Sequence, residues 1–571
     1  MHYLKYIAVC FFIFFATVVL QAQPESVSRL YITVEQYQAD VRSLERAFVL
    51  EESPKYFDRM EQLHNNWLNR LDQMNYSDLN TSEAVDFILL RRNIRRDLQE
   101  LQQSRSSYNA IKPTIRFADI IQNLQEKRRV GVDIEGSRFA EQLDTLAEAI
   151  RKNKEQIKDQ GRLEPHESRR SVEVVKNLRQ TLDNVYTFYD GYDPDVTWWG
   201  PESYEDADTT LSNYATYLEE WTVDQSHKDD GSGIIGDPVG REKLLELLEY
   251  EMIPYTPEEL IELAEKEYQW CLDQMLKASE DLGYGDDWHA ALEHTKNTYV
   301  PPGKQPEVIY DLAIRAIDFL EERDLLTIPE LAKETWSMEM MTPERQLINP
   351  FFLGGRVIRI SYPTNTMDYE AKMMSMRGNN PNFSNATVHH ELIAGHHLQG
   401  FMTDRYHPYR DVFRTPFWIE GWALYWELQL WDMDFPETPE ERIGMLYWRM
   451  HRAARIIFSL RFHLGEMSPQ EAIDFIVEKV GHEYKNAEAE VRRSFEANYP
   501  PLYQAAYMLG GLQIRALYNE LVVNGDMPDK NFHDRILKNG NMPIEMVRKI
   551  LTGQKPPKDF ETNWRFYEEL N

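Results

Sequence analysis

The segment VHHELIAGHHLQ, residues 388–399, constrains the fold of this chain more than any other stretch. It places four histidines and one glutamate within twelve positions, and a second glutamate, Glu420, opens the aromatic segment WIEGWALYWE at 418–427. A zinc hydrolase needs two histidines that hold the metal, an adjacent carboxylate that activates water, and a more distant carboxylate ligand. We therefore expect the fold to bring these two segments together.

The spacing of the histidines predicts an interrupted helix. In zinc peptidases of the His-Glu-x-x-His type, the two histidines are four residues apart on one helix face. Here His396 follows His390 by six residues, which turn a regular helix by about 600° and leave His396 roughly 120° off the face of His390. Gly395 permits a bulge or a break that would return His396 to the metal.

Two histidines compete for the second ligand position. His397 returns to the face of His390 after seven residues, but it lies about 10.5 Å along the axis. Zn–N bonds of about 2.0–2.1 Å make that reach awkward on a straight helix. We therefore favour His396 as the ligand and assign His397 to substrate binding.

Carboxylates complete the expected site. Glu420 is the favoured third ligand and leaves one coordination position for water, with Glu427 as the alternative. Glu391 would be the general base that takes the water proton and passes it to the leaving amine. Zn²⁺ is the expected metal, and cobalt or manganese would accept similar ligands.

Composition excludes several classes of partner. The chain has 571 residues, of which 27% are charged and 42% hydrophobic, as in ordinary globular proteins. Its formal net charge of −31 argues against nucleic acid, because phosphate binding needs basic patches. We interpret the acidic balance as a source of solubility, with an acidic cleft as the alternative.

The N-terminus has the pattern of a secretory signal peptide. Lys5 precedes an almost wholly apolar run, and residues 1–23 end near a plausible cleavage point. Once this segment is removed we expect no stable membrane span, an uncleaved signal anchor being the alternative. Only Cys271 then remains, in an apolar helix pattern that predicts burial. Export without disulfides favours a bacterial periplasmic or extracellular protein.

Hydrophobic periodicity predicts a mainly helical chain. Apolar residues recur at spacings of three and four in three clear N-terminal stretches. We expect Ser82 to cap one helix, and another helix to start at Thr256 with Pro257 in first position. The predicted regions are a helical scaffold at 24–225 and a helical catalytic region at 226–571. The stretches are 31–52, 82–103 and 139–160, and the expected linker is the polar, glycine-rich segment 223–243.

Two segments depart from the helical pattern. GGRVIRISYPT, 354–364, predicts a strand with Ile358, Ile360 and Tyr362 on one face. That strand would be part of a hairpin, or a sheet edge that pairs with an extended peptide. The aromatic segment 193–208 predicts a turn-rich surface loop.

These motifs resemble the large bacterial domain-of-unknown-function family 885, which is grouped with the gluzincin-type metallopeptidases. VHHELIAGHHLQ and EGWALYWE are similar to its patterns His-Glu-x-x-Pro-Gly-His-His-x-Gln and Glu-Gly-Trp-Ala. Further similar motifs lie at 236–268, 452–473 and 501–511. The resemblance implies a mainly α, gluzincin-like fold with a small β-sheet beside the active-site helix.

The resemblance also implies roles for individual residues. The metal and base positions match His390, Glu391, His396 and Glu420, and a later tyrosine matches Tyr507. By analogy with gluzincins, this tyrosine would donate a hydrogen bond to the tetrahedral oxyanion.

A second set of matching residues would bind substrate. Arg452, Arg455 and His463 match an Arg-Ala-x-x-Arg-like segment and the histidine that follows it. They would bind a substrate carboxylate through bidentate contacts, or else form structural ion pairs.

Three positions depart from the family pattern. Ala394 replaces the usual proline, Ser459 replaces an aspartate, and Tyr503 replaces a glutamine. The ligand set is complete, so metal chemistry is expected while substrate preference is open. The sequence predicts an exported zinc-dependent hydrolase that cleaves peptide bonds, mostly in short peptides. The alternatives are a hydrolase of a non-peptide amide or a peptidoglycan fragment, and a non-catalytic helical binding protein.

Overall fold

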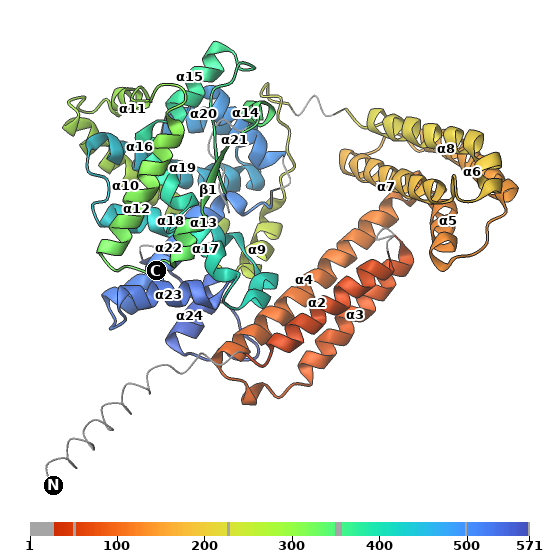
Figure 1. The fold of residues 1–571 in the computed structure, drawn as a ribbon, viewed down its shortest axis with the longest axis horizontal. Coiled ribbons are helices and arrows are strands. Elements are labelled where there is room, and N and C mark those ends of the chain that lie inside the picture. Colours follow the sequence, from red (N-terminus) through yellow and green to blue (C-terminus); the bar gives the residue numbers. More distant parts are fainter. Residues whose placement is uncertain (1–27, 49–52, 225–228, 349–356, 497–498, 569–571) are drawn as a thin grey trace, which may run out of the picture. The chain divides into compact units, whose positions relative to one another are not determined.

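The structure, a computed structural model, describes residues 28–48, 53–224, 229–348, 357–496 and 499–568. These residues form α-helices almost throughout, with one two-stranded sheet (Figure 1). The predicted mainly helical fold class is therefore confirmed. The expected signal segment 1–23 lies outside the described residues. Among the described helices, none combines the length and the apolar character that crossing a membrane requires.

The chain divides into two compact units. The N-terminal unit comprises Tyr37–Met74 and Arg91–Asp237, and the histidine unit comprises the described parts of Met1–Gln36, Asn75–Leu90 and Pro238–Asn571. The boundary at Asp237 falls inside the glycine-rich segment 223–243. The segment 75–90 belongs to the histidine unit, although it lies within the predicted region 24–225.

A buried ion pair fastens that early segment to the rest of the histidine unit. Asp86 accepts hydrogen bonds from Arg410 Nε at 2.8 Å and from the Tyr409 hydroxyl at 2.7 Å. The side chains of Arg410 and Asp86 are both fully buried. Charges without access to water must be paired and hydrogen-bonded, so these contacts fix where the segment lies.

The helix α4 that carries Asp86 begins two residues earlier than predicted. It spans Thr81–Ile111, and Asn80 accepts a hydrogen bond from the Glu83 N–H while the Glu83 side chain accepts one from the Asn80 N–H. The expected cap at Ser82 is therefore wrong. Asn80 takes that role because Glu83, three residues later, completes a reciprocal capping box.

The N-terminal unit is a set of helices around its own apolar core. Among the described residues, helices occupy most of the three stretches that the periodicity predicted: 31–47 of the first, all of 82–103, and 139–158 of the third. The segment 193–208, however, is not a loop, because Asp193 caps a helix there with Pro194 in its first turn. The helices are α2 (Tyr31–Ala47), α3 (Pro54–Asp72), α4, η3 (Lys112–Thr114), α5 (Ala118–Val130), α6 (Gly136–Lys158), α7 (Pro165–Tyr189) and α8 (Pro194–Glu220), with the first turns of α2 and α4 in the histidine unit.

The histidine unit contains the remaining helices (Figure 1). Thr256 caps helix α10 through a capping box with Glu259, and the helix starts where the sequence predicted. The helices are η2 (Tyr76–Asp78), α9 (Gly240–Tyr250), α10 (Pro257–Asp281), α11 (Trp288–Lys296), α12 (Gln305–Glu322), α13 (Glu330–Thr335), α14 (Pro343–Ile348), α15 (Tyr369–Gly378), α16 (Pro381–Glu391), α17 (His396–Thr403), η5 (Pro408–Phe413), α18 (Pro416–Asp432), α19 (Pro439–Leu464), α20 (Pro469–Val480), α21 (Tyr484–Phe495), α22 (Tyr503–Tyr518), η6 (Asn519–Val523), α23 (Asp529–Asn539) and α24 (Ile544–Thr552).

A short sheet lies against the helix that carries the first histidines. Strands β1 (Ser337–Met340) and β2 (Val357–Ile360) pair in parallel. Ile358 and Ile360 are fully buried and belong to one apolar cluster with Val388 and Leu392. The predicted strand is confirmed for Val357–Ile360, with Ile358 and Ile360 facing inward as predicted. Tyr362, expected on the same face, lies beyond the end of the strand. The hairpin alternative is wrong, because the two strands run in the same direction and a hairpin joins antiparallel strands.

The EGWALYWE segment forms a helix, α18, that is buried on nearly all sides. Trp418, Trp422 and Trp426 are among the largest fully buried side chains. Helix α18 packs closely on α22, since a Cβ added to Gly421 would lie 2.6 Å from the Gly510 Cα. This backbone approach is possible only without side chains at both positions. It brings the start of α22 next to Glu420.

Cys271 lies within α10 and is fully buried. Burial raises the pKa of its thiol to about 12, because the thiolate would be desolvated. The side chain therefore packs as a small apolar group, as predicted.

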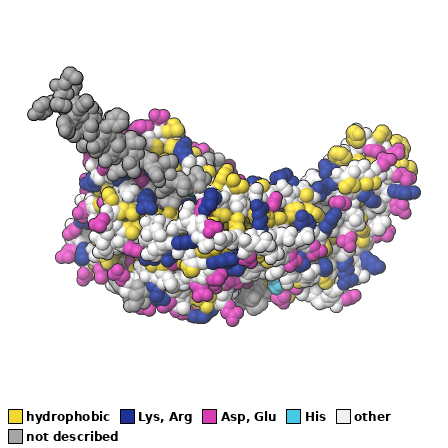
Figure 2. Space-filling view, turned by 90° about the horizontal axis from the view of Figure 1, so that it is seen from below, with side chains coloured by type: hydrophobic (Ala, Val, Ile, Leu, Met, Phe, Trp, Pro, Cys, Tyr) yellow, Lys and Arg dark blue, Asp and Glu magenta, His cyan; other side chains and the backbone are white. Residues whose placement is uncertain are grey.

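The surface carries charges of both signs. Figure 2 shows acidic side chains spread over the visible face with basic side chains interspersed among them. This distribution agrees with our interpretation of the net charge of −31 as a source of solubility.

The contact between α18 and α22 predicts a stability difference between two glycines. A Cβ at Gly510 would overlap the carbonyl oxygen of Phe417, whereas a Cβ at Gly400 in α17 would meet nothing within 4 Å. We expect Gly510→Ala to lower the free energy of unfolding by about 1–3 kcal/mol. The matched Gly400→Ala should leave it unchanged or raise it by up to about 1 kcal/mol. Urea denaturation followed by circular dichroism measures both, and equal stability of the two variants would contradict the packing described.

Candidate metal centre

The predicted helix break lies between Glu391 and His396. Helix α16 ends at Glu391, α17 begins at His396, and a Cβ at Gly395 would overlap the carbonyl groups of His389 and His390. The Gly395 N–H instead donates a hydrogen bond to the His389 carbonyl at 2.9 Å. Glycine is therefore required here by close backbone approach.

A tryptophan from α18 stabilises the same break. The indole Nε1 of Trp422 donates a hydrogen bond to the Ala394 carbonyl at 2.7 Å. Buried carbonyls freed by a helix break need such partners. Trp422 belongs to the Glu-Gly-Trp-Ala motif, so this contact joins the two segments that the sequence analysis singled out.

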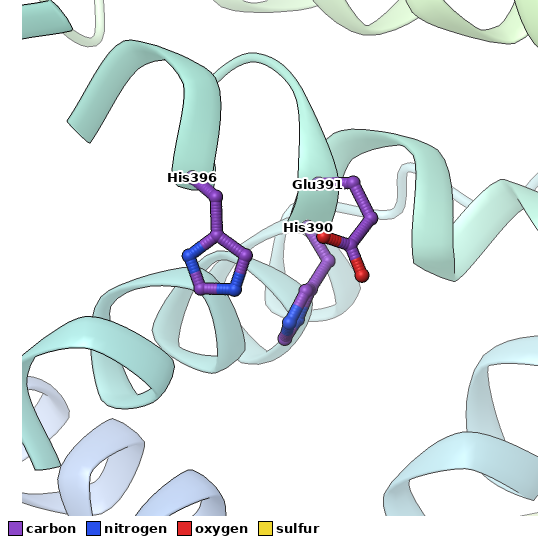
Figure 3. A group of neighbouring side chains, drawn as sticks. All are labelled: His390, Glu391 and His396. Carbon is purple, nitrogen blue, oxygen red and sulfur yellow. The ribbon is translucent and has the colours of Figure 1, made fainter. Parts of the chain in front are cut away.

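The break brings His396 next to His390 (Figure 3). Glu420 faces both histidines. The Glu420 Oε2 lies 3.6 Å from His390 Nε2 and 3.2 Å from His396 Nε2. Zinc bonds of about 2.0–2.1 Å in tetrahedral geometry place neighbouring ligand atoms about 3.3 Å apart. Both distances from the Glu420 oxygen are therefore close to the ligand separation that a single zinc ion requires.

Glu391 lies at the same centre. Ligand atoms of His390, Glu391 and His396 lie within 4.8 Å of one another. Figure 3 shows the Glu391 carboxylate beside the His390 ring, from the last turn of α16. This position suits a carboxylate that faces a water molecule next to the cation.

Glu427 fixes the orientation of His390. Its Oε1 lies 2.7 Å from His390 Nδ1. An ionised carboxylate only accepts hydrogen bonds, so Nδ1 donates and the lone pair of a neutral imidazole is on Nε2, toward Glu420. Such carboxylate–histidine pairs support metal-binding imidazoles in many sites. The geometry therefore favours Glu420 over Glu427 as the third ligand.

Gln399 performs the same task for His396. Its Nε2 donates to the carbonyls of Trp418 and Ile419 at 3.1 and 3.2 Å, which turns its Oε1 toward His396 Nδ1 at 3.3 Å. Nδ1 then donates, and in the neutral imidazole the lone pair lies on Nε2, on the side of Glu420, where it could bind a cation. In both histidines, Nε2 is therefore the nitrogen that faces the Glu420 carboxylate.

Without a cation, the positive charge that balances the buried carboxylates comes from protons on the two histidines. Burial lowers the pKa of His390, but hydrogen bonds to Glu420 and Glu427 outweigh it and raise the pKa to about 9. The pKa of His396 is also raised, because Glu420 outweighs burial. Burial raises the pKa of Glu420, but the two histidines hold it well below its usual range. A divalent cation would replace protons at these atoms.

Two tyrosines of α22 cover the third ligand. The Tyr503 hydroxyl donates a hydrogen bond to Glu420 Oε1 at 2.7 Å, and the Tyr507 hydroxyl lies 3.5 Å from that of Tyr503. Tyr507 also stacks on the His390 ring at a centroid distance of 6.2 Å. The sequence analysis predicted Tyr507 at the site but treated Tyr503 only as a departure. Its position four residues earlier, on the same helix face, was the available signal.

A cavity of about 1680 Å³ opens beside the centre. Arg452 and Arg455 line it, as do His390, Glu391, His396, Glu420 and Tyr507. His397 and His463 are buried and are not among its lining residues. His397 Nε2 lies 2.9 Å from the Ala332 carbonyl, and the His463 ring packs on Phe462. The structure thus brings together the predicted set except for these two histidines.

The fold and this centre define a mainly helical protein with a buried His-His-Glu site at a helix break. The chain matches the profile of the family described as "Bacterial protein of unknown function (DUF885)" over residues 48–551. The protein therefore belongs to this family. No curated protein matches the chain.

Solved structures of similar fold include one protein from Shewanella oneidensis and one from Colwellia psychrerythraea. Both proteins are described as lipoproteins, the first as one of unknown function. The first has 15% sequence identity and a TM-score of 0.67, covering 91% of this chain and 98% of its own. The second has 14% identity and a TM-score of 0.56, covering 92% and 97%. At these identities the similarity establishes the shared fold.

The contact of Glu427 with His390 predicts a change in metal affinity. Glu427→Gln should weaken zinc binding about 10–100-fold, because a neutral amide supports the imidazole less well. Competition with a fluorescent chelator measures the affinity. The control is Glu267→Gln, since Glu267 is equally buried but pairs with Arg449 and is not among the cavity-lining residues. Unchanged affinity in Glu427→Gln would contradict the assigned role.

Proposed function

We propose that the protein is an exported zinc-dependent peptidase of the gluzincin type. The observation that carries this proposal is the meeting of His390 Nε2, His396 Nε2 and Glu420 Oε2 at separations of 3.2 and 3.6 Å. Two imidazole nitrogens and one carboxylate oxygen are a typical ligand set of catalytic zinc sites, which keep one position open for water. The adjacent Glu391 favours a catalytic site over a purely structural one.

The residues of the chain divide the chemistry between them. A bound zinc ion would supply Lewis acidity, which polarises a carbonyl and lowers the pKa of water. Glu391 accepts the proton of the attacking water and delivers it to the leaving amine. Glu427 and Gln399 keep the two imidazoles oriented throughout.

The tyrosines of α22 provide hydrogen-bond donors at the same place. The Tyr507 hydroxyl faces the centre next to Tyr503 and is positioned to donate to an oxyanion as the carbonyl is attacked. Tyr503 already donates to Glu420 at 2.7 Å, so its role is to hold the third ligand.

The cavity supports a peptide as substrate. Its volume of about 1680 Å³ exceeds the roughly 300–1,000 Å³ of small-molecule sites. Polar, charged and aromatic side chains line it, and these suit an extended chain of several residues. The apolar N-terminal segment and the lipoprotein descriptions of the two similar structures support a location outside the cytoplasm.

The general base gives the sharpest test of catalysis. We expect Glu391→Gln to bind zinc as the unaltered protein does while its turnover falls about 10²–10⁴-fold, since glutamine cannot accept the proton. Turnover is measured on a mixture of short peptides by mass spectrometry of the products. Zinc content is measured on the same samples.

The matched control is Glu488→Gln. Glu488 lines the same cavity but pairs with Arg492 on the surface of α21, so its loss should leave turnover unchanged. Equal turnover by the unaltered protein and Glu391→Gln on every peptide cleaved would contradict the proposal. The absence of any cleavage by zinc-loaded, folded protein would do the same.

A further inference from the structure

Three arginines line the cavity close to the metal centre. Arg452 and Arg455 lie one turn apart on α19, and Arg493 lies on α21. The carboxylates that face them are Glu427, 3.6 Å from Arg452, and Glu490, 2.7 Å from Arg455 and 4.0 Å from Arg493. Within 4.0 Å, three permanent positive charges thus meet two carboxylates, while Glu420 and Glu391 act on Arg452 from farther away.

Neighbouring histidines do not change this balance. His451 and His482 hydrogen-bond to each other at 3.0 Å, and His451 lies 3.9 Å from Glu490. Burial lowers the pKa of His482 to about 3 and that of His451 well below its usual value. Both are neutral at pH 7, and the excess positive charge rests on the guanidinium groups.

Two of these arginines have buried N–H groups that no protein group accepts. Arg452 is 6% exposed and Arg455 is 4% exposed. Within the described chain, Arg452 Nε and Arg455 Nη1 have no hydrogen-bond partner. The Glu427 oxygen at 3.6 Å from Arg452 lies beyond hydrogen-bond distance. Buried donors without partners destabilise a protein, so an acceptor supplied from the cavity would satisfy them.

Tyr507 links this pair of arginines to the metal centre. Its ring lies 4.7 Å from the Arg452 guanidinium and 4.8 Å from that of Arg455, and it stacks on His390. The Tyr507 ring therefore separates the candidate metal-binding residue His390 from Arg452 and Arg455. An extended chain advances about 3.3–3.6 Å per residue, so this separation corresponds to about one or two residues beyond the bond that is cleaved.

We propose that Arg452 and Arg455 bind the free C-terminal carboxylate of a peptide, so that the enzyme removes residues from the C-terminal end. The inference rests on the proposed metal-dependent peptidase function and names its substrate class. A guanidinium fork matches a planar carboxylate in charge and geometry. The interior of a longer peptide would offer only neutral amides here and would leave a buried charge unbalanced.

The test compares ligands that differ only at the carboxylate. The probes are hydroxamates, which chelate zinc, joined through a succinyl group to alanine or to alanyl-alanine, each as the free acid and as the C-terminal amide. A glutamate amide of the same series carries a side-chain carboxylate instead. Binding to the zinc-loaded full chain is measured by isothermal titration calorimetry.

We expect the better-fitting free acid to bind about tenfold or more tightly than its amide, as expected for a charge-assisted contact with buried arginine. The glutamate amide should not recover this difference. Arg452→Gln should remove the preference for the acid, and Lys485→Gln should retain it. Lys485 lines the same cavity but is exposed, and melting curves establish that each variant is folded.

The outcomes separate this inference from the function on which it rests. Equal binding of acid and amide by the unaltered protein at both lengths would overturn the carboxylate site and leave the metal site in place. A glutamate amide that binds as tightly as the acid would also overturn it, in favour of recognition of an acidic side chain. Failure of every hydroxamate to bind zinc-loaded protein would overturn the metal-dependent function, and the carboxylate inference with it.

Discussion

The break in the helix between Glu391 and His396 is the constraint on which the site depends. An unbroken helix would turn His396 away from His390, and a side chain at position 395 would overlap the backbone of the preceding turn. The break is held by the Gly395 hydrogen bond and by Trp422 from α18. The same helix α18 carries Glu420 and Glu427. The broken helix and α18 together therefore provide all three ligands and the carboxylate that orients His390.

Charge balance explains why so many polar groups lie in the interior. His390 is held between two carboxylates, and Glu420 is held between two imidazoles and the Tyr503 hydroxyl. Each burial would be costly for an isolated charge, and each is offset by a partner at hydrogen-bond or ion-pair distance. A buried set of acids and bases with opposing shifts in pKa is typical of functional sites rather than of structural cores.

The sequence predicted the local part of this arrangement and missed the long-range part. The six-residue histidine spacing and Gly395 indicated an interrupted helix, and the pattern of Ile358 and Ile360 indicated a strand. The aromatic segment that begins at Asp193 suggested a turn-rich loop, because the same Asp-Pro pair starts both turns and helices. The roles of Tyr503 and of Glu490 could not be predicted, since they follow from how α21 and α22 pack around α18 and α19. Gly421 and Gly510 make that packing possible, yet neither glycine shows by itself which helix it meets.

Zinc content of the purified protein tests the central claim most directly. The measurement is elemental mass spectrometry after zinc is offered and the excess removed, beside a His390→Ala/Glu420→Ala variant verified as folded by circular dichroism. The account predicts about one zinc ion per chain, as in catalytic sites with three protein ligands, and its loss in the variant. A folded protein that retains no metal, or a variant that retains as much as the unaltered chain, would contradict it.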